Sequence, residues 1–208
     1  TDDQAQATFS YDGDGGIPVG GLLQRALFAW RFRDVNLLIS DLIQGDSRIM
    51  IYRDITARVP KAAPFLRFDA DPYSAVVEGR LVWIWDAYTT TDQYPYSDFV
   101  DLSEVASPSA QEQAPSLGGD VNYLRNSVKV VVDAYNGTAE FYVSDPTDPI
   151  IQSFAKIFPQ LFKPLETMPE ELRAHVRYPQ DFFTIQAHVY ATYHMQDPQV
   201  FFNKEDLL

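Results

Sequence analysis

The sequence contains no cysteine, which excludes disulfide bonds, thiolate catalysis and cysteine-ligated metal sites. It also lacks any run of the roughly 18 to 20 apolar residues that a membrane-spanning helix requires. The N-terminus shows no basic segment followed by an apolar one, the pattern of a signal peptide. We therefore expect a chain that does not itself cross a membrane.

Basic residues are scarce as well. Sixteen Lys and Arg are set against 29 Asp and Glu, and the formal net charge is −13. Nucleic-acid binding depends on clustered positive charge, so we expect no nucleic-acid partner. Anionic membrane surfaces are disfavoured for the same reason. Cations, basic proteins and neutral ligands stay open as partners, and the charge also fits a role in solubility alone.

The common catalytic fingerprints are missing too. No GxSxG, HExxH, GxxxxGK[ST] or GxGxxG pattern occurs. The three histidines, His175, His188 and His194, are not spaced three or four apart, as two metal ligands on one helix would be. The sequence thus predicts no catalytic residues, no metal site and no cofactor.

What the chain does have is apolar and aromatic material. Apolar residues make up 46% of the 208 residues and aromatic residues 14%, which is typical of a folded globular domain. Residues 1–16 are polar and rich in Gly and Asp, which predicts a flexible arm. We expect a single domain over 17–208, with a loop or disordered insertion near 101–120, where small and polar residues and prolines prevail.

Helices are expected at both ends of the chain. Apolar residues recur at helical spacing after Pro18, at Leu22, Leu23, Ala26, Leu27 and Trp30. A second short helix is expected at 36–43. Toward the C-terminus, Asp148 and Pro149 fit the cap and first residue of a helix. Thr167 with Glu170 fits a capping box, and the longest helix is expected at 179–194.

Two β-hairpins are predicted between these helices. The first covers 74–88, with Glu78-Gly79 as its turn and apolar residues on both faces of its second strand. The second covers 124–144, with Asn136-Gly137 as a two-residue turn. That turn fixes the register, pairing Val132 with Phe141 and Val130 with Val143. It also places Asp133 opposite Glu140, an unfavourable like-charge pair.

These elements together predict an α+β domain. We expect N-terminal helices, an antiparallel sheet containing hairpins near 74–88 and 124–144, and a C-terminal helical group that covers one face of the sheet.

Aromatic and acidic residues gather along 83–98, and this segment supplies our candidate ligand contacts. Rings beside carboxylates and hydroxyls are what a carbohydrate or a peptide strand requires. Trp83 and Trp85 lie in the middle of the predicted strand and are assigned to the core. The candidates for ligand binding are therefore Asp86, Tyr88, Tyr94 and Tyr96.

Two further groups of polar residues have alternative explanations. Asn122, Arg125 and Lys129 give the strand before the second turn a basic and amide edge, for which salt bridges to acidic neighbours are a sufficient account. Calcium could be held by paired acids, either Asp69 with Asp71 or Asp145 with Asp148. Capping and turn chemistry explains the same acids without an ion.

The segments at 122–203 and 69–97 resemble uncharacterised protein family 0182, a group of large membrane proteins of actinobacteria and cyanobacteria. The first reads NYLRNSVKVVVDAYNGTAEFYVSDPTDPIIQSFAKIFPQLFKPLETMPEELRAHVRYPQDFFTIQAHVYATYHMQDPQVFFN, and the second reads DADPYSAVVEGRLVWIWDAYTTTDQYPYS. The resemblance covers most of 15–208. It implies several N-terminal membrane spans followed by a long soluble region outside the cytoplasm, of which this chain would be a part.

That resemblance brings no catalytic residue with it. It implies a location at the cell membrane, facing away from the cytoplasm, and as partners the protein's own membrane-spanning region and components of the cell envelope. Our first hypothesis is a non-enzymatic binding or assembly module. The alternatives are an envelope glycan hydrolase that uses two carboxylates, or a calcium-dependent module.

Overall fold

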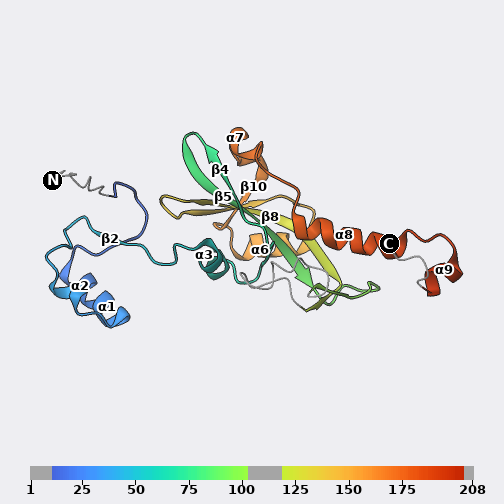
Figure 1. Ribbon diagram of the computed structural model, residues 1–208, viewed down its shortest axis with the longest axis horizontal. Helices are drawn as coiled ribbons and strands as arrows, with labels where there is room; N and C mark the ends of the chain where they lie inside the picture. Colours follow the sequence, from blue (N-terminus) through green and yellow to red (C-terminus); the bar gives the residue numbers. More distant parts are fainter. Residues whose placement is uncertain (1–10, 103–118, 204–208) are drawn as a thin grey trace, which may run out of the picture. The chain divides into compact units, whose positions relative to one another are not determined.

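A computed structural model describes residues 11–102 and 119–203 (Figure 1). The chain forms two compact units, one of residues 1–51 with 135–138 and one of residues 52–134 with 139–208. The sequence had indicated a single domain over 17–208. The predicted arm at 1–16 is described only from residue 11, and the predicted loop at 101–120 only at its two ends.

The smaller unit contains two helices and a short β-ladder. Strand β1 (Ile17–Pro18) pairs antiparallel with β2 (Arg48–Ile49). Helix α1 (Leu22–Phe32) confirms the helix expected from the apolar spacing, and it ends at Arg33, which adopts a left-handed conformation. Helix α2 (Asn36–Ile39) is shorter than the predicted 36–43. No residue of α1 is buried.

The larger unit is built on a six-stranded sheet. Strands β10, β9, β8, β5 and β3 follow one another across it, and β4 also pairs with β5. All pairings are antiparallel except that of β10 with β9. The bounds are β3 (Arg67–Phe68), β4 (Tyr73–Val77), β5 (Arg80–Thr91), β8 (Tyr123–Asp133), β9 (Ala139–Val143) and β10 (Phe162–Pro164). Strands β6 (Val100–Asp101) and β7 (Asp120–Val121) pair separately.

Helices cover both faces of this sheet, which confirms the α+β class. On one face α3 (Ile55–Ala62) and α6 (Pro149–Ile157) bury Val59 and Ile151 against Trp85 and its neighbours. On the other, Leu172 of α7 (Glu170–Arg173), which follows η1 (Leu165–Thr167), packs near Ile84. The C-terminal helices are thus divided between the faces rather than gathered on one, because β5 and β8 carry apolar residues on both sides.

The structure tests the two helix caps that were predicted from the sequence. Asp148 caps α6 as expected, and its carboxylate accepts from the backbone N–H groups of Ile150 and Ile151. The predicted capping box at Thr167 is wrong. Thr167 lies in η1 and its hydroxyl donates to the Pro164 carbonyl, because the chain turns once more before α7 begins after Pro169. The longest helix is α8 (Gln180–Tyr193), as predicted, and α9 (Pro198–Asn203) follows it.

The second hairpin forms with a register that differs from the prediction. Val130 pairs with Phe141, and Val128 with Val143, a shift of two residues. Of the residues at the turn, Gly137 has a positive φ of 70° but Asn136 does not, so the two-residue turn is replaced by a longer loop. A shift of two keeps every side chain on its predicted face, because the strand period is also two. Glu140 then lies opposite Val131, and Asp133 forms an ion pair with Arg80 at 2.6 Å.

The first hairpin turns at Glu78-Gly79 as predicted, with Val77 paired to Arg80. Both turn residues have positive φ, 50° and 73°, as a type I′ turn demands.

We expect Gly79→Ala to lower the free energy of unfolding by about 1–2 kcal/mol, because a Cβ there meets no neighbour and only the backbone is strained. Urea unfolding followed by circular dichroism measures the change. Glu78→Gly in the same turn should cause no loss, and an equal loss in both variants would contradict this account.

Candidate functional site

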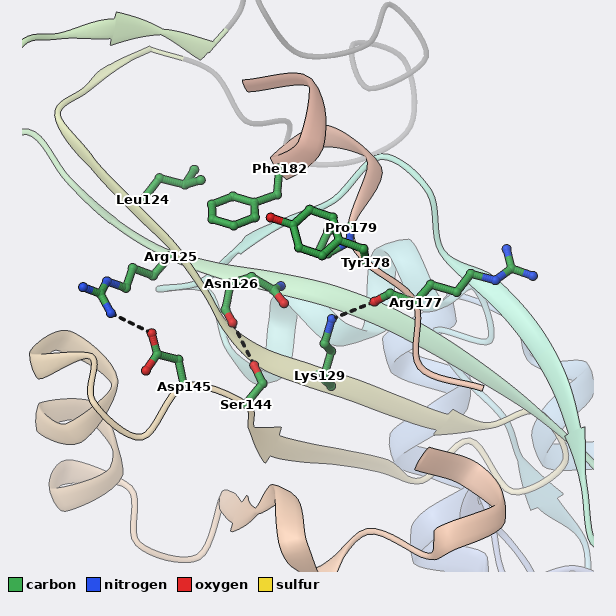
Figure 2. Close-up of a pocket in the computed structure, with 10 residues that line it drawn as sticks. All are labelled: Leu124, Arg125, Asn126, Lys129, Ser144, Asp145, Arg177, Tyr178, Pro179 and Phe182. Carbon is green, nitrogen blue, oxygen red and sulfur yellow. Dashed lines mark hydrogen bonds and ion pairs between the residues drawn. The ribbon is translucent and has the colours of Figure 1, made fainter. Parts of the chain in front are cut away.

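A pocket of about 450 Å³ opens beside β8, where the chain leading into α8 crosses the sheet (Figure 2). Its lining comes from three separate stretches: the first half of β8, the end of the second hairpin, and the segment that enters α8. The ten lining residues are Leu124, Arg125, Asn126, Lys129, Ser144, Asp145, Arg177, Tyr178, Pro179 and Phe182. All of them belong to the larger unit.

Lys129 lies on the sheet and forms the buried polar base of the pocket. The strand register places it opposite Asp86 of β5, and the two side chains form an ion pair. The ammonium also donates to the carbonyl oxygen of Arg177 at 3.2 Å (Figure 2). Burial raises the pKa of the Asp86 carboxyl, and the Lys129 ammonium and the Asn126 amide offset this only in part. The Lys129 ammonium thus offsets part of the cost of burying the Asp86 carboxylate.

A second ion pair stands at the rim. Arg125 reaches the Asp145 carboxylate at 2.9 Å (Figure 2), and both side chains are partly exposed. Asp145 also accepts from the backbone N–H and hydroxyl of Thr147. The hydrogen bonds from Thr147 and Arg125 lower the pKa of Asp145, so it is ionised at neutral pH.

The opposite wall is apolar and aromatic. Leu124, Tyr178, Pro179 and Phe182 supply it, and the rings of Tyr178 and Phe182 lie 5.9 Å apart at 37°. Figure 2 shows these rings across the opening from Arg125 and Asn126. The Arg177 side chain extends away from the pocket, and its guanidinium lies 4.5 Å from the centre of the Tyr73 ring.

Two buried aspartates fix α8 in place and so position this wall. The backbone N–H of Asp181 donates to the Asp69 carboxylate at 3.1 Å, and the N–H of Ala70 donates to the Asp181 carboxylate at 2.8 Å. The Tyr88 hydroxyl donates to Asp69 as well, and burial with that carboxylate nearby raises the pKa of Tyr88. The two hydrogen bonds between Asp181 and the 69–70 segment connect the start of α8 to the loop after β3.

The four candidate contacts from the sequence fall outside the pocket lining. Asp86 and Tyr88 are buried in the sheet. Asp86 forms its ion pair with Lys129 there, and the ring centres of Tyr88 and Phe182 lie 6.0 Å apart. Tyr94 and Tyr96 are exposed, and Tyr94 stacks on Tyr123 at 5.2 Å. The structure therefore does not bring the four together in one site.

Sequence reasoning noticed only part of the pocket. Arg125 and Lys129 were identified as a basic edge, and their salt-bridge explanation is what the structure shows. Asn122 instead bonds to the backbone of Tyr94. Tyr178, Pro179 and Phe182 carry no motif; the only available signal was an aromatic cluster at a predicted helix start.

Three of the four acids considered for calcium, Asp69, Asp145 and Asp148, accept hydrogen bonds from protein donors. Asp69 accepts from the Asp71 N–H, Tyr88 and Asp181. Asp148 accepts from three hydroxyl groups and two backbone N–H groups. Across the two described ranges, no three His, Asp or Glu side chains gather as a metal site would require. Asp69, Asp145 and Asp148 thus have the capping and turn roles that the sequence left as the alternative.

In the larger unit, which has an α+β fold, this pocket combines an aromatic wall, two ion pairs and one lining carboxylate. A glycan hydrolase needs two carboxyl groups across the opening, one of them with a raised pKa. Of the ten lining residues only Asp145 carries one, and its pKa is lowered. Among the lining residues that the structure describes, no second carboxyl group stands opposite Asp145.

Sequence comparison places the chain in a family. The model of the uncharacterised protein family UPF0182 matches residues 1–207, and the chain belongs to this family. UPF0182 proteins of Pelotomaculum thermopropionicum and a Synechococcus strain are 51% and 49% identical over 197 residues, 95% of this chain. One of Cupriavidus necator is 50% identical over 198 residues. No solved structure matches the chain.

The relatives also correct the expected range of organisms and show how much of their length the chain covers. The relatives come from bacteria of many phyla, so the restriction to actinobacteria and cyanobacteria was too narrow. The chain spans only about a fifth of the length of the relatives it matches, 20–21%, and is part of a larger protein. Of the helices within the described ranges, none combines the length and apolar character needed to cross a bilayer.

Proposed function

We propose that this chain is a non-enzymatic binding module in the part of a larger membrane protein that faces away from the cytoplasm. Its pocket binds a neutral, hydroxyl-rich component of the cell envelope, such as a saccharide unit. The observation that carries this proposal is the combination of an aromatic wall with two cations, Lys129 and Arg125, that already have carboxylate partners.

Charge pairing argues for a neutral ligand. Lys129 is compensated by Asp86, and Arg125 by Asp145. A carboxylate or phosphate entering the pocket would have to displace one of these partners. Saccharide hydroxyls both donate and accept, so they can bridge a matched pair without breaking it, and an apolar sugar face can stack on a ring.

The cellular setting rests on the resemblance and on the relatives' length. Because the relatives are about five times as long as this chain, there is room for membrane-spanning regions in the protein to which the chain belongs. We propose that the chain lies at the cell membrane and assembles with that membrane part and with envelope components.

Arg125→Gln tests the pocket. A screen of soluble cell-wall glycan fragments first identifies a saccharide that binds. Arg125→Gln removes the positive charge at the rim that would bind a pair of its hydroxyl groups. We expect the affinity for this saccharide to fall about tenfold or more. Isothermal titration calorimetry measures the affinity. Arg80→Gln is the matched control, since Arg80 forms a similarly exposed ion pair with Asp133 outside the pocket lining.

Two results would contradict the pocket's role. The first is equal loss of affinity in both variants. The second is a screen in which only acidic fragments raise the melting temperature, because a ligand that binds the folded state must stabilise it. The latter would indicate that an anion displaces Asp145 or Asp86 from its partner.

A further inference from the structure

The apolar face of α1 is turned to solvent. The residues whose spacing predicted a helix lie within an arc of about 140° at 100° per residue, yet Leu23 is 72% exposed and Trp30 is 81% exposed. Leu22 and Leu27 are exposed too. In the same unit, Val35, Ile39 and Leu42 are further exposed apolar residues. A contiguous apolar arc of this kind marks an interaction surface.

The charge of the same helix is opposite to that of the chain. Between residues 22 and 33 the sequence contains three arginines, Arg25, Arg31 and Arg33, and no acidic residue, although the whole chain carries −13. The Arg25 guanidinium donates to the backbone carbonyls of Val19 and Ile43, which leave its charge uncompensated. Among the described residues, none of the ion pairs involves these arginines.

We propose that α1 binds the surface of a lipid bilayer that contains anionic headgroups. A basic helix with Leu and Trp on its apolar face, and too short to span, is the type that lies in the membrane interface. Its 11 residues extend about 16 Å at 1.5 Å per residue, far below the thickness of the hydrocarbon core. The net charge of −13 averages over an uneven distribution, in which residues 22–33 carry positive charge alone and Asp34 follows them.

The apolar and the basic side chains of this segment would contact different layers of the bilayer. Leu23, Leu27 and Trp30 enter the boundary between headgroups and acyl chains, which removes them from water. Arg31 and Arg33 remain at the level of the phosphates. The inference depends on the smaller unit alone and does not require the pocket in the larger unit to bind a saccharide.

Vesicle binding tests the proposal with the 208-residue chain. We expect it to co-sediment with vesicles of phosphatidylcholine mixed with phosphatidylglycerol, and more weakly with phosphatidylcholine alone. The tryptophan emission should shift to the blue on binding. Because Trp85 is already buried and Trp83 partly so, most of the shift should be lost in Trp30→Phe while binding persists.

Two substitutions separate the apolar and the charged contributions. Leu23→Glu should reduce vesicle affinity at least about tenfold. Arg31→Gln should reduce it about fivefold on the anionic vesicles alone, and added salt should weaken wild-type binding to them. Both side chains are exposed, so circular dichroism should show an unchanged fold. Ile157→Glu is the matched control, an equally drastic change at a 63% exposed helical position of the larger unit, and should leave affinity unchanged.

Three results would overturn the proposal. The first is no binding to anionic vesicles, which would leave the arc to another region of the longer protein. The second is binding that Leu23→Glu and Arg31→Gln leave intact. The third is a dimer in light scattering that Leu23→Glu dissociates, which would show that a second copy covers the arc.

Discussion

Lys129→Met is expected to lower the free energy of unfolding by about 3–5 kcal/mol, since it leaves the Asp86 carboxylate buried without its cation. The two side chains are among the least exposed charged groups of the larger unit, at 7% and 3%. Desolvation dominates there, because water reaches neither group to replace the lost partner. Urea unfolding followed by circular dichroism measures the change.

The double variant Asp86→Asn with Lys129→Met is the control. It removes both charges, keeps an acceptor for the Asn126 amide, and should recover most of the loss. The Arg177 carbonyl still loses a donor, so recovery is incomplete. A double variant as unstable as Lys129→Met would show that the ammonium acts through packing and not through charge.

The direction of the pH dependence follows from Asp86. Its folded pKa is raised, so the folded state holds the proton more tightly than the unfolded state. The cost of the unpaired carboxylate is therefore absent below the unfolded value of about 4 and grows as the pH rises through the folded pKa. Lys129→Met should accordingly be closest to wild type in acid.

Asp148→Ala is expected to cost about 3–5 kcal/mol, from a lost helix cap of about 1–2 kcal/mol and buried hydroxyls left without an acceptor. Asp148 is fully buried and joins α6 to the sheet. Its carboxylate accepts from Thr89 at 2.5 Å, Ser127 at 2.6 Å, Tyr123 at 2.6 Å, and the N–H groups of Ile150 at 3.0 Å and Ile151 at 3.3 Å. Thermal and urea unfolding measure the loss.

Asp54→Ala provides the comparison for Asp148. Asp54 caps α3 and accepts from the Thr56 backbone, but this cap is exposed, so we expect a loss of only about 1 kcal/mol. Similar losses in both variants would mean that the hydroxyl network around Asp148 contributes nothing beyond the cap.

The contribution of Asp148 to the free energy of unfolding should also depend on pH. Burial alone would raise its pKa, but the bonds from Ser127, Thr89, Tyr123 and the helix outweigh burial and lower it. Its contribution is thus fully present above the unfolded value of about 4 and is lost as the pH falls through the lower folded pKa. Asp148→Asn should lack this acid-dependent part.

Prediction from the sequence succeeded where a structure is decided by neighbouring residues. The Asp148 cap, the Glu78-Gly79 turn and the presence of helix α1 each follow from side chains within a few positions of one another. It failed at Asn136-Gly137 in a limited way: the alternation of β8 and β9 selects the face of each side chain but does not distinguish registers that differ by two residues.

The pocket and the exposed helix lay beyond such reasoning. The pocket unites residues from 124–129, 144–145 and 177–182, which only the folded sheet and α8 bring together. The amphipathic pattern of α1 is the same whether its apolar arc packs inside a domain or faces outward, so the sequence alone does not distinguish the two.

The sequence by itself determined the local elements, their caps, the absence of thiol chemistry and the uneven distribution of charge. Only the tertiary structure decided that Asp86 would face Lys129, that Tyr178 and Phe182 would form a wall, and that Leu23 and Trp30 would meet solvent. The physical reason is that capping and turn preferences act over one turn of chain, whereas burial depends on which distant surfaces come to cover a side chain.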